Sequence, residues 1–431
     1  MTDYIEPRVL KGFRDFLPDA EITRRSLREK IESTFRSFGF LPIDTPAIEY
    51  AEILLGKGGG ETEKQIYRFK DNGQRDIALR FDLTVPFARF TALHRAELLF
   101  PFKRYHIGKV WRGENTQRGR YREFMQCDFD IIGSDNPASD FEIILLIHTA
   151  LSNLGIDVNI HVNHRGLFNR FLSNLDLGSK SVEILRTVDK FSKVGEDETQ
   201  KNLAALAGDE KAQKILQYTG AKGSFTDVLN RITELSGGPS AESQRLLLLH
   251  QYAQDVSGSF TFTLDPSITR GLDYYTGVVF ETFLKELPDI GSVCSGGRYD
   301  NLAGLYSKEK DAISGVGSSI GLDRLLVALE SLGKLPDAKD CLLAIACADD
   351  KNSGLYQSLA LKFRQEGIPC EVFLEADRQL VKQFVLAEKK GMRYVIIPGD
   401  NPLTDKLTLR CLASRSNLEL TFEEALEKIK T

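Results

Sequence analysis

The segment most diagnostic of the architecture reads Trp111-Arg112-Gly113-Glu114-Asn115-Thr116-Gln117-Arg118-Gly119-Arg120-Tyr121-Arg122-Glu123-Phe124. Four arginines lie between positions 112 and 122, against the single acid Glu114. A strand-like run ends at Arg112 and another follows the loop, so the segment predicts a hairpin with arginines at its mouth. Guanidinium groups pair with phosphate oxygens and neutralise charge on a transferred group. Such a hairpin could hold a polyphosphate while Phe124 stacks on a base; a solvated arginine-rich hairpin is the alternative.

The strand after this hairpin carries polar residues on one face. Gln126, Asp128 and Asp130 occupy alternate positions, and alternate side chains of a strand point to the same side. With apolar neighbours around them they suggest the floor of a pocket, the alternative being a polar sheet face toward water. Asp82 and Thr84 also alternate in the sequence, and they could bind an ammonium group.

A second diagnostic segment runs Arg270-Gly271-Leu272-Asp273-Tyr274-Tyr275-Thr276-Gly277 and leads into a strand-like stretch. It combines a guanidinium, a carboxylate and two phenols between glycines, which let the backbone approach a ligand closely. These groups suit a small, flat, polar molecule beside a phosphate, although an ordinary loop with two core tyrosines would also fit. Further on, Cys294–Asp300 reads as a small-residue turn that delivers an arginine and Tyr299 to a second pocket wall.

A glycine-rich segment, Gly315–Leu325, predicts a strand of small residues that runs into a helix. Its glycine spacing is G-x-G-x-x-x-G and no early βαβ unit accompanies it, so a dinucleotide site is not favoured. Close packing beside a nucleotide, with Arg324 reaching it, fits better. The sequence contains no phosphate-binding P-loop and no Ser/His/Asp or Cys/His arrangement for nucleophilic catalysis.

Composition limits the classes of function. The chain has 431 residues and a net charge of −5, so binding to nucleic acid would have to rest on local basic patches. No segment approaches the apolar length of a membrane span, and Met1–Leu10 has no apolar signal core. The six cysteines form no C-x-x-C pair, which indicates reduced, mostly buried residues of a cytoplasmic protein rather than a zinc site.

Hydrophobic periodicity and turn signals divide the chain. A helix is expected over 20–38, a short strand over 40–46, mainly strands over 65–133 with a helix near 84–95, and a helix over 138–154. Residues 165–257 alternate short helical pieces with Gly and Ser, as in a helical insertion. Strands return at 260–264 and 278–284, and Gly333–Asp337 reads as a linker. Beyond it strands and helices alternate: strand 342–348, helix 353–366, strand 370–374, helix 377–390 and strand 394–397.

Three of these regions, in this order, resemble the defining motifs of class II aminoacyl-tRNA synthetases: the helix 20–38 with Pro46, the arginine hairpin, and Gly315–Arg324. Arg270–Gly277 and Cys294–Asp300 then resemble the two signature peptides of the histidyl-tRNA synthetase family, and the resemblance covers essentially the whole chain. Asp82–Pro86 and Arg118–Asp130 resemble the eukaryote-like branch more than the common bacterial one, which tends to carry glutamate at the positions of Asp82 and Asp130.

The resemblance implies an α+β fold. Residues 1–333 would form the class II catalytic domain, an antiparallel sheet flanked by helices with the helical insertion at about 165–257. Residues 338–431 would form an α/β anticodon-binding domain.

The resemblance also implies a reaction and roles for the residues. Histidine and ATP would give histidyl-adenylate and pyrophosphate, and the acyl group would pass to the terminal ribose of histidine tRNA. Arg270 and Arg112 would be catalytic. The histidine site would comprise Asp82, Thr84, Gln126, Asp130, Arg270, Tyr274, Tyr275 and Tyr299. ATP would meet Arg112, Glu114, Arg122, Phe124 and Arg324, and the tRNA acceptor end Arg118, Arg120 and Tyr121.

The implied partners are L-histidine, ATP with Mg²⁺, histidine tRNA and a second copy of the chain in a homodimer, with no membrane. No protein side chain is assigned as a metal ligand. The main rival is a non-catalytic paralogue, the regulatory subunit of ATP phosphoribosyltransferase, which tends to lose the arginine-bearing signature and the anticodon domain. A different class II synthetase is the second rival, but it would not explain Tyr274-Tyr275.

Overall fold

The computed structural model describes residues 4–56, 61–189, 194–256, 260–268, 274–307, 313–336, 341–374 and 379–430. The chain separates into two compact units, one of residues 1–16 and 24–335 and the other of residues 17–23 and 336–431. Among the described helices, none combines the length and apolar character that a membrane crossing requires. The six cysteines are free thiols, four of them buried.

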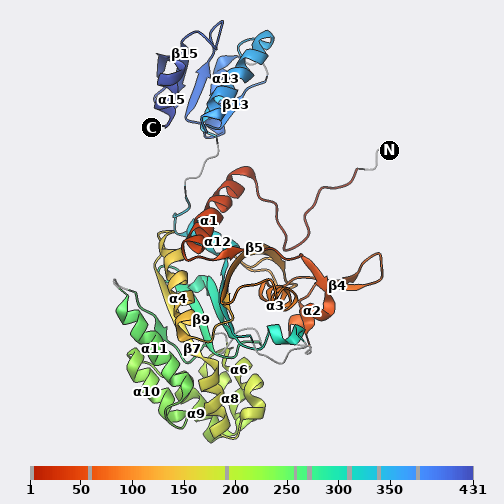
Figure 1. Cartoon of the computed structure of the whole chain (residues 1–431), viewed down its shortest axis with the longest axis vertical. Helices are drawn as coiled ribbons and strands as arrows, with labels where there is room; N and C mark the ends of the chain where they lie inside the picture. The colour runs from red at the N-terminus through yellow and green to blue at the C-terminus, as the bar shows by residue number, and fades with distance from the viewer. Residues whose placement is uncertain are drawn as a thin grey trace. The chain divides into compact units, whose positions relative to one another are not determined.

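The larger unit is built on an eight-stranded sheet in the order β1-β5-β6-β11-β10-β9-β7-β8 (Figure 1). The pairs β1–β5 and β7–β8 are parallel and the other neighbours are antiparallel. A small sheet, β2-β4-β3, lies beside it. The strands are β1 (Leu41–Pro42), β2 (Ile48–Tyr50), β3 (Arg68–Lys70), β4 (Asp76–Leu79), β5 (Phe102–Trp111), β6 (Glu123–Ile132), β7 (Val158–His164), β8 (Thr263–Leu264), β9 (Val278–Leu284), β10 (Cys294–Tyr299) and β11 (Gly315–Gly321).

Helices cover one face of this sheet. Leu27, Ile31 and Phe35 of α1 (Pro18–Ser37) are buried, and the Phe35 ring lies 4.9 Å from that of Phe129 on β6. The helices α4 (Pro137–Ser152) and α12 (Leu322–Ser331) contribute to the same core. Because β6 alternates, its odd-numbered residues enter this core and Gln126, Asp128 and Asp130 face the other way.

The other face is partly covered by α3 (Thr84–Leu93), whose Phe87 packs with Phe102 and Tyr299. The helices α2 (Ala51–Leu55) and η1 (Glu61–Lys64) belong to the segment around the small sheet. Short 3-10 turns η3 (Pro288–Ile290) and η4 (Ala303–Tyr306) follow β9 and β10. The polar side of β6 is therefore the side on which a pocket can form.

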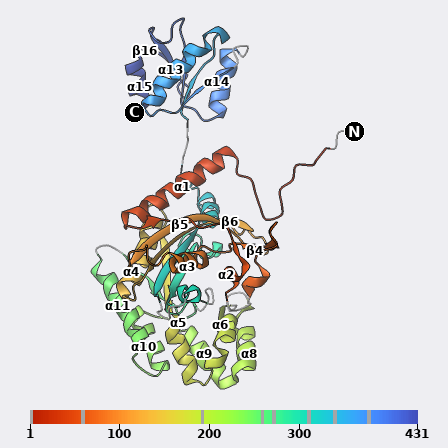
Figure 2. The same cartoon turned by 45° about the vertical axis from the view of Figure 1, so that its right-hand side comes forward.

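A group of helices gathers near the β7–β8 edge. Figure 2 shows these helices together in a second view. They are α5 (Arg165–Asn174), η2 (Gly178–Lys180), α6 (Ser181–Asp189), α8 (Glu196–Ala207), α9 (Asp209–Thr219), α10 (Phe225–Leu235) and α11 (Ala241–Asp255). Within the described part of residues 165–255 no strand occurs, which agrees with the helical composition expected there.

The smaller unit has its own five-stranded sheet, in the order β13-β12-β14-β15-β16. The strands β12 (Leu343–Ile345), β13 (Cys370–Val372) and β14 (Tyr394–Ile397) are parallel, and β15 (Leu407–Cys411) and β16 (Asn417–Leu420) continue antiparallel. The helices are η5 (Asp350–Asn352), α13 (Ser353–Gln365), α14 (Leu380–Lys389) and α15 (Phe422–Lys430). The sequence predicted β12, α13, β13, α14 and β14, although the predicted helix 377–390 begins outside the described residues. It did not predict β15, β16 and α15.

Two expectations about local structure were wrong. Cys294–Asp300 is not a turn but the strand β10 over Cys294–Tyr299, because small residues there allow close pairing between β9 and β11. A Cβ on Gly296 would lie 2.1 Å from the Gly317 carbonyl oxygen. Asp82 and Thr84 do not alternate on a strand, because Thr84 already begins α3 and the Asp82 carboxylate accepts the Val85 backbone N–H at 3.0 Å.

Candidate active site

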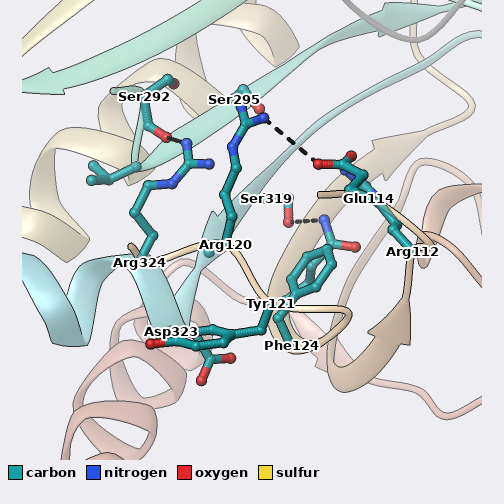
Figure 3. Close-up of a pocket in the computed structure, with 14 residues that line it drawn as sticks. Arg112, Glu114, Arg120, Tyr121, Phe124, Ser292, Ser295, Ser319, Asp323 and Arg324 are labelled. Carbon is teal, nitrogen blue, oxygen red and sulfur yellow. Dashed lines mark hydrogen bonds and ion pairs between the residues drawn. The ribbon is translucent and has the colours of Figure 1, made fainter. Parts of the chain in front are cut away.

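A pocket of about 160 Å³ opens between the arginine hairpin, the strand β11 and the start of α12 (Figure 3). Its lining residues come from the hairpin, from β11 and α12, and from the start of β10 and the residues just before it: Arg112, Glu114, Gly119, Arg120, Tyr121, Phe124, Gln126, Ser292, Val293, Ser295, Ser319, Gly321, Asp323 and Arg324. The pocket therefore brings together side chains from the hairpin and from the glycine-rich segment, which lie about two hundred positions apart in the sequence.

Two arginines and a phenylalanine frame the pocket. The Arg112 Nε donates to the Phe81 carbonyl oxygen at 2.9 Å, and its guanidinium carbon lies 5.2 Å from the Phe124 ring centroid. Arg324 comes from α12 and donates from Nη1 to the Ser292 carbonyl oxygen at 2.5 Å. In Figure 3 Arg324 and Phe124 enter from opposite sides of the pocket. A flat base between a guanidinium plane and an aromatic ring would be held by stacking.

The N-terminal segment ties the hairpin to α12. Arg14 donates from Nη2 to Asp323 Oδ1 at 2.5 Å, and its guanidinium carbon lies 3.9 Å from the Tyr121 ring centroid. The second Asp323 oxygen accepts the Met125 backbone N–H at 2.6 Å. The Arg122 backbone N–H donates to the Gly12 carbonyl oxygen at 2.8 Å. Sequence reasoning missed Arg14, since a single arginine between Phe13 and Asp15 carries no pattern.

Below the pocket, Asp130 forms a buried charged group with Arg104. The Arg104 Nη2 lies 2.6 Å from Asp130 Oδ2, with both side chains at most 2% exposed. The Tyr299 hydroxyl donates to the other oxygen, Oδ1, at 2.6 Å. The Phe87 ring lies 4.2 Å below the Arg104 guanidinium. Burial raises the pKa of Asp130, and the Arg104 charge opposes that rise.

The strand register explains how this ion pair forms. Arg104 of β5 stands directly opposite Asp130 of β6, and Gly317 of β11 stands on the other side of Asp130. A Cβ on Gly317 would lie 2.0 Å from Asp130 Oδ1, so only glycine leaves room for the carboxylate. Sequence reasoning missed Arg104 because it lies in a strand-like run where a basic residue is usually a surface residue.

Asp82 lies at the start of α3 and faces the tyrosine pair. The Tyr274 hydroxyl donates to Asp82 Oδ2 at 3.2 Å, and the Tyr274 and Tyr275 ring centroids are 4.9 Å apart. Asp82 is 2% exposed, and its burial raises the pKa to about 6, with Arg112 among the charges that oppose the rise. Burial also raises the pKa of both tyrosines, which therefore stay neutral hydrogen-bonding groups.

The predicted site residues are distributed unevenly in the structure. Arg112, Glu114, Arg120, Tyr121, Phe124, Gln126 and Arg324 line the pocket, and the buried groups around Asp82, Asp130, Tyr274 and Tyr299 lie on the same face of the fold. Arg118 instead donates to the Ser331 hydroxyl, and the Arg122 guanidinium binds the Glu114 and Lys11 carbonyl oxygens. Arg270, with Gly271, Leu272 and Asp273, lies outside the described residues.

The architecture and the pocket define a class II aminoacyl-tRNA synthetase core: an antiparallel sheet with an arginine hairpin facing a glycine-rich strand and helix. The family model described as "Histidyl-tRNA synthetase" matches residues 12–325, and the model "Anticodon binding domain" matches residues 342–431. The chain belongs to the histidyl-tRNA synthetase family.

Individual relatives agree. The chain is 51% identical to the histidine–tRNA ligase of Treponema denticola, with 100% of this chain and 99% of the relative covered. It is 49% identical to the histidine–tRNA ligase of Treponema pallidum, over 99% of this chain and 98% of that one. Among solved structures, histidyl-tRNA synthetase from Nostoc sp. PCC 7120 superposes with a TM-score of 0.86 at 31% identity and 99% coverage of both chains.

Proposed function

We propose that the chain is a histidine–tRNA ligase, which forms histidyl-adenylate from L-histidine and ATP and then transfers the histidyl group to the 3'-terminal ribose of histidine tRNA. The observation that carries the proposal is the polar face of β6. Phe124 and Gln126 line the pocket suited to a nucleotide, and Asp130 follows on the same face among buried hydrogen-bonding groups. One strand thus joins a site for ATP to a site for a small polar amino acid.

Activation of an amino acid requires alignment more than a protein nucleophile. The substrate carboxylate attacks the α-phosphate, and the catalyst must hold the two groups together and stabilise the charge that develops. Arg112 would grip the α-phosphate, because the Phe81 carbonyl fixes its Nε and its side chain lines the pocket. Arg270 would act from the opposite side, a role that rests on its place in the signature peptide.

Recognition of histidine would divide between two groups of residues. Asp82, Thr84 and Gln126 would hold the α-ammonium group, and Asp130, Tyr274, Tyr275 and Tyr299 would surround the imidazole. A site that hydrogen-bonds a polar side chain can reject an analogue lacking it by roughly 10⁴-fold. The adenine would lie between Phe124 and Arg324, with Glu114 bonding to it and Arg122 supporting the loop.

Magnesium would accompany ATP. In the described part of the chain no group of three His, Cys, Asp or Glu residues forms a metal cluster, and both oxygens of Asp323 are already engaged. Mg²⁺ would therefore be held mainly by phosphate oxygens, where it neutralises polyphosphate charge. Glu114, which lies 3.6 Å from Arg120 Nη1, stays assigned to the adenine.

Transfer of the histidyl group requires contact with tRNA. Arg118, Arg120 and Tyr121 lie in the hairpin loop and would meet the acceptor end, with Arg118 held over α12 by Ser331. The catalytic domain would comprise residues 1–333, with the helical insertion at about 165–257, and residues 338–431 would bind the anticodon. Phosphate contacts supply much of the affinity for tRNA, and base contacts supply the identity.

The enzyme would act as a homodimer in the cytoplasm. The apolar side of α1 is covered by the chain's own sheet, so it is not by itself an argument for a partner. Support comes instead from large apolar side chains left exposed near β1 and β2 and before β5, namely Leu41 (58%), Ile48 (45%), Tyr50 (49%) and Leu99 (87%). Sedimentation should show a dimer at micromolar concentration, and a monomer would contradict this assignment.

Exchange of labelled pyrophosphate into ATP tests the activation step. We expect exchange that depends on L-histidine and falls to background with phenylalanine, glutamine or no amino acid. Gln126→Leu should raise the histidine KM while leaving the ATP KM within a few-fold, because it removes an ammonium acceptor. Exchange supported equally by other amino acids would refute the proposed substrate.

A further inference from the structure

Asp128 is an acid on the pocket face to which the proposed ATP and histidine sites assign no role. It lies on β6 between Gln126 and Asp130, and its side chain is 2% exposed. Its Oδ1 has no hydrogen-bond partner among the residues that the structure describes. A buried acceptor without a donor is costly, more so when it carries a charge. The position therefore suits a ligand that carries a hydrogen-bond donor.

The arginine whose charge acts on this carboxylate, Arg104, is already paired with another acid. Arg104 pairs with Asp130 at 2.6 Å rather than with Asp128. The Ser319 hydroxyl, directly across from Asp128 on β11, hydrogen-bonds the carboxylate but leaves Oδ1 without a donor. Burial raises the pKa of Asp128 to about 7, and the nearby Asp130 charge adds to the rise. An incoming cation would restore the ionised form that burial disfavours.

Gln126, two residues earlier on the same face, also has a hydrogen-bond acceptor without a donor. Its Nε2 donates to the Ser319 hydroxyl at 2.8 Å, and its Oε1 has no hydrogen-bond partner among the described residues. Two residues of a strand span roughly 6.7 Å, a separation from which a glutamine and an aspartate side chain can converge on one atom. Two adjacent acceptors without donors suit an ammonium group, which has three N–H donors, better than a neutral imidazole, which has one.

We propose that Asp128 is a specificity-determining residue whose Oδ1 accepts a hydrogen bond from the α-ammonium group of the bound amino acid, beside Gln126. The inference rests on the proposed function and extends it. Asp130 remains with the imidazole: Tyr299 donates to its Oδ1, and its Oδ2, 2.6 Å from Arg104 Nη2, has no hydrogen-bond partner among the described residues. A purely internal role is the alternative. In it, water joins Asp128 to His106, which stands directly opposite on β5 and whose Nδ1 also lacks a partner in the described part of the chain.

Two inhibitors of pyrophosphate exchange separate these roles. L-Histidinol has the imidazole and the ammonium group, whereas imidazole-4-propionate has the imidazole and no ammonium. Asp128→Asn should raise the inhibition constant of histidinol roughly 10- to 100-fold, the effect of losing a charge-assisted hydrogen bond. It should change the constant for imidazole-4-propionate less than twofold. Because an inhibition constant does not depend on the fraction of active protein, partial misfolding of the variant does not alter the comparison.

Asp197→Asn, at an exposed acid of α8, is the matched control and should change neither constant. Equal weakening of both inhibitors by Asp128→Asn would overturn the proposal, because Asp128 would then act on the imidazole or on the shape of the pocket. Unchanged constants for both would overturn it in favour of the internal role. If the wild-type protein showed no histidine-dependent exchange at all, the proposed function itself would fail.

Discussion

Replacement of Asp130 by alanine should lower the free energy of unfolding of the catalytic unit, apart from any effect on substrate binding. The change leaves the Arg104 guanidinium, which is fully buried, without the carboxylate that now lies 2.6 Å away. Removing one partner of a buried ion pair costs about 3–5 kcal/mol, because the remaining charge is uncompensated. The Tyr299 hydroxyl also loses its acceptor, which lowers the free energy of unfolding by about a further 1–3 kcal/mol.

The companion variants separate these contributions. Tyr299→Phe should cost only the smaller amount, since the ion pair stays intact. The double variant Asp130→Ala/Arg104→Met should recover most of the loss, because it removes both charges and leaves an apolar side chain over the Phe87 ring. The pair should therefore show a large coupling free energy in a double-mutant cycle.

Urea unfolding followed by tryptophan fluorescence is the assay. Trp111 is the single tryptophan of the chain and lies at the end of β5, so its emission reports on the catalytic unit and not on the C-terminal unit. All variants should be compared at one protein concentration, since association shifts the apparent stability. A loss below about 1 kcal/mol for Asp130→Ala, or a double variant as unstable as the single one, would refute the reasoning.

The other predictions concern catalysis. Burial raises the pKa of Asp82 to about 6. The contribution of Asp82 to the free energy of unfolding is therefore present below the unfolded pKa, near 3.9, and is lost as pH rises through about 6. Since the ionised form binds an ammonium group, the histidine KM should fall between pH 5 and 7, and Asp82→Asn should remove the part of that fall not due to histidine's own imidazole. Arg14→Met should raise the ATP KM about tenfold with little effect on the histidine KM, because Arg14 holds Tyr121 and Asp323; equal changes in both KM values would point to general unfolding. Arg270→His should lower the activation rate by about 10²-fold with a modest change in histidine KM, and a rate within threefold of wild type would exclude the assigned role. A chain truncated near Pro336 should, as a folded dimer, keep pyrophosphate exchange and lose most tRNA charging at low tRNA concentration; full charging would show that the C-terminal unit is dispensable.

The sequence predicted the elements that carry strong local patterns. The hairpin was recognisable because arginines and a glycine separate two strand-like runs, and it appears as β5 and β6 with pairing from Phe102 to Ile132. The run from β11 into α12 was recognisable because small residues precede a regular helical pattern. The resemblance to the eukaryote-like branch rests on residues 82–86 and 118–130 and stays a prediction; the two relatives reported above are from Treponema.

What the sequence could not predict depends on contacts between distant strands. The pairing of Arg104 with Asp130 follows from the β5–β6 register, and the space for it follows from Gly317 on β11. Cys294–Tyr299 looked like a turn because its composition is rich in small residues, whereas sheet pairing on both sides makes it a strand. The link from Arg14 to Asp323 spans 309 positions and leaves no local signal.

A crystal structure with a non-hydrolysable histidyl-adenylate analogue tests the central claim most directly, because the claim is that one face of β6 joins the two substrate sites. We predict the adenine between Phe124 and Arg324, the phosphate mimic at Arg112, and the α-ammonium nitrogen within about 2.7–3.2 Å of Gln126 Oε1. The imidazole should lie toward Asp130 and Tyr275. An analogue bound with its adenine away from Phe124, or with its ammonium group away from β6, would contradict the account.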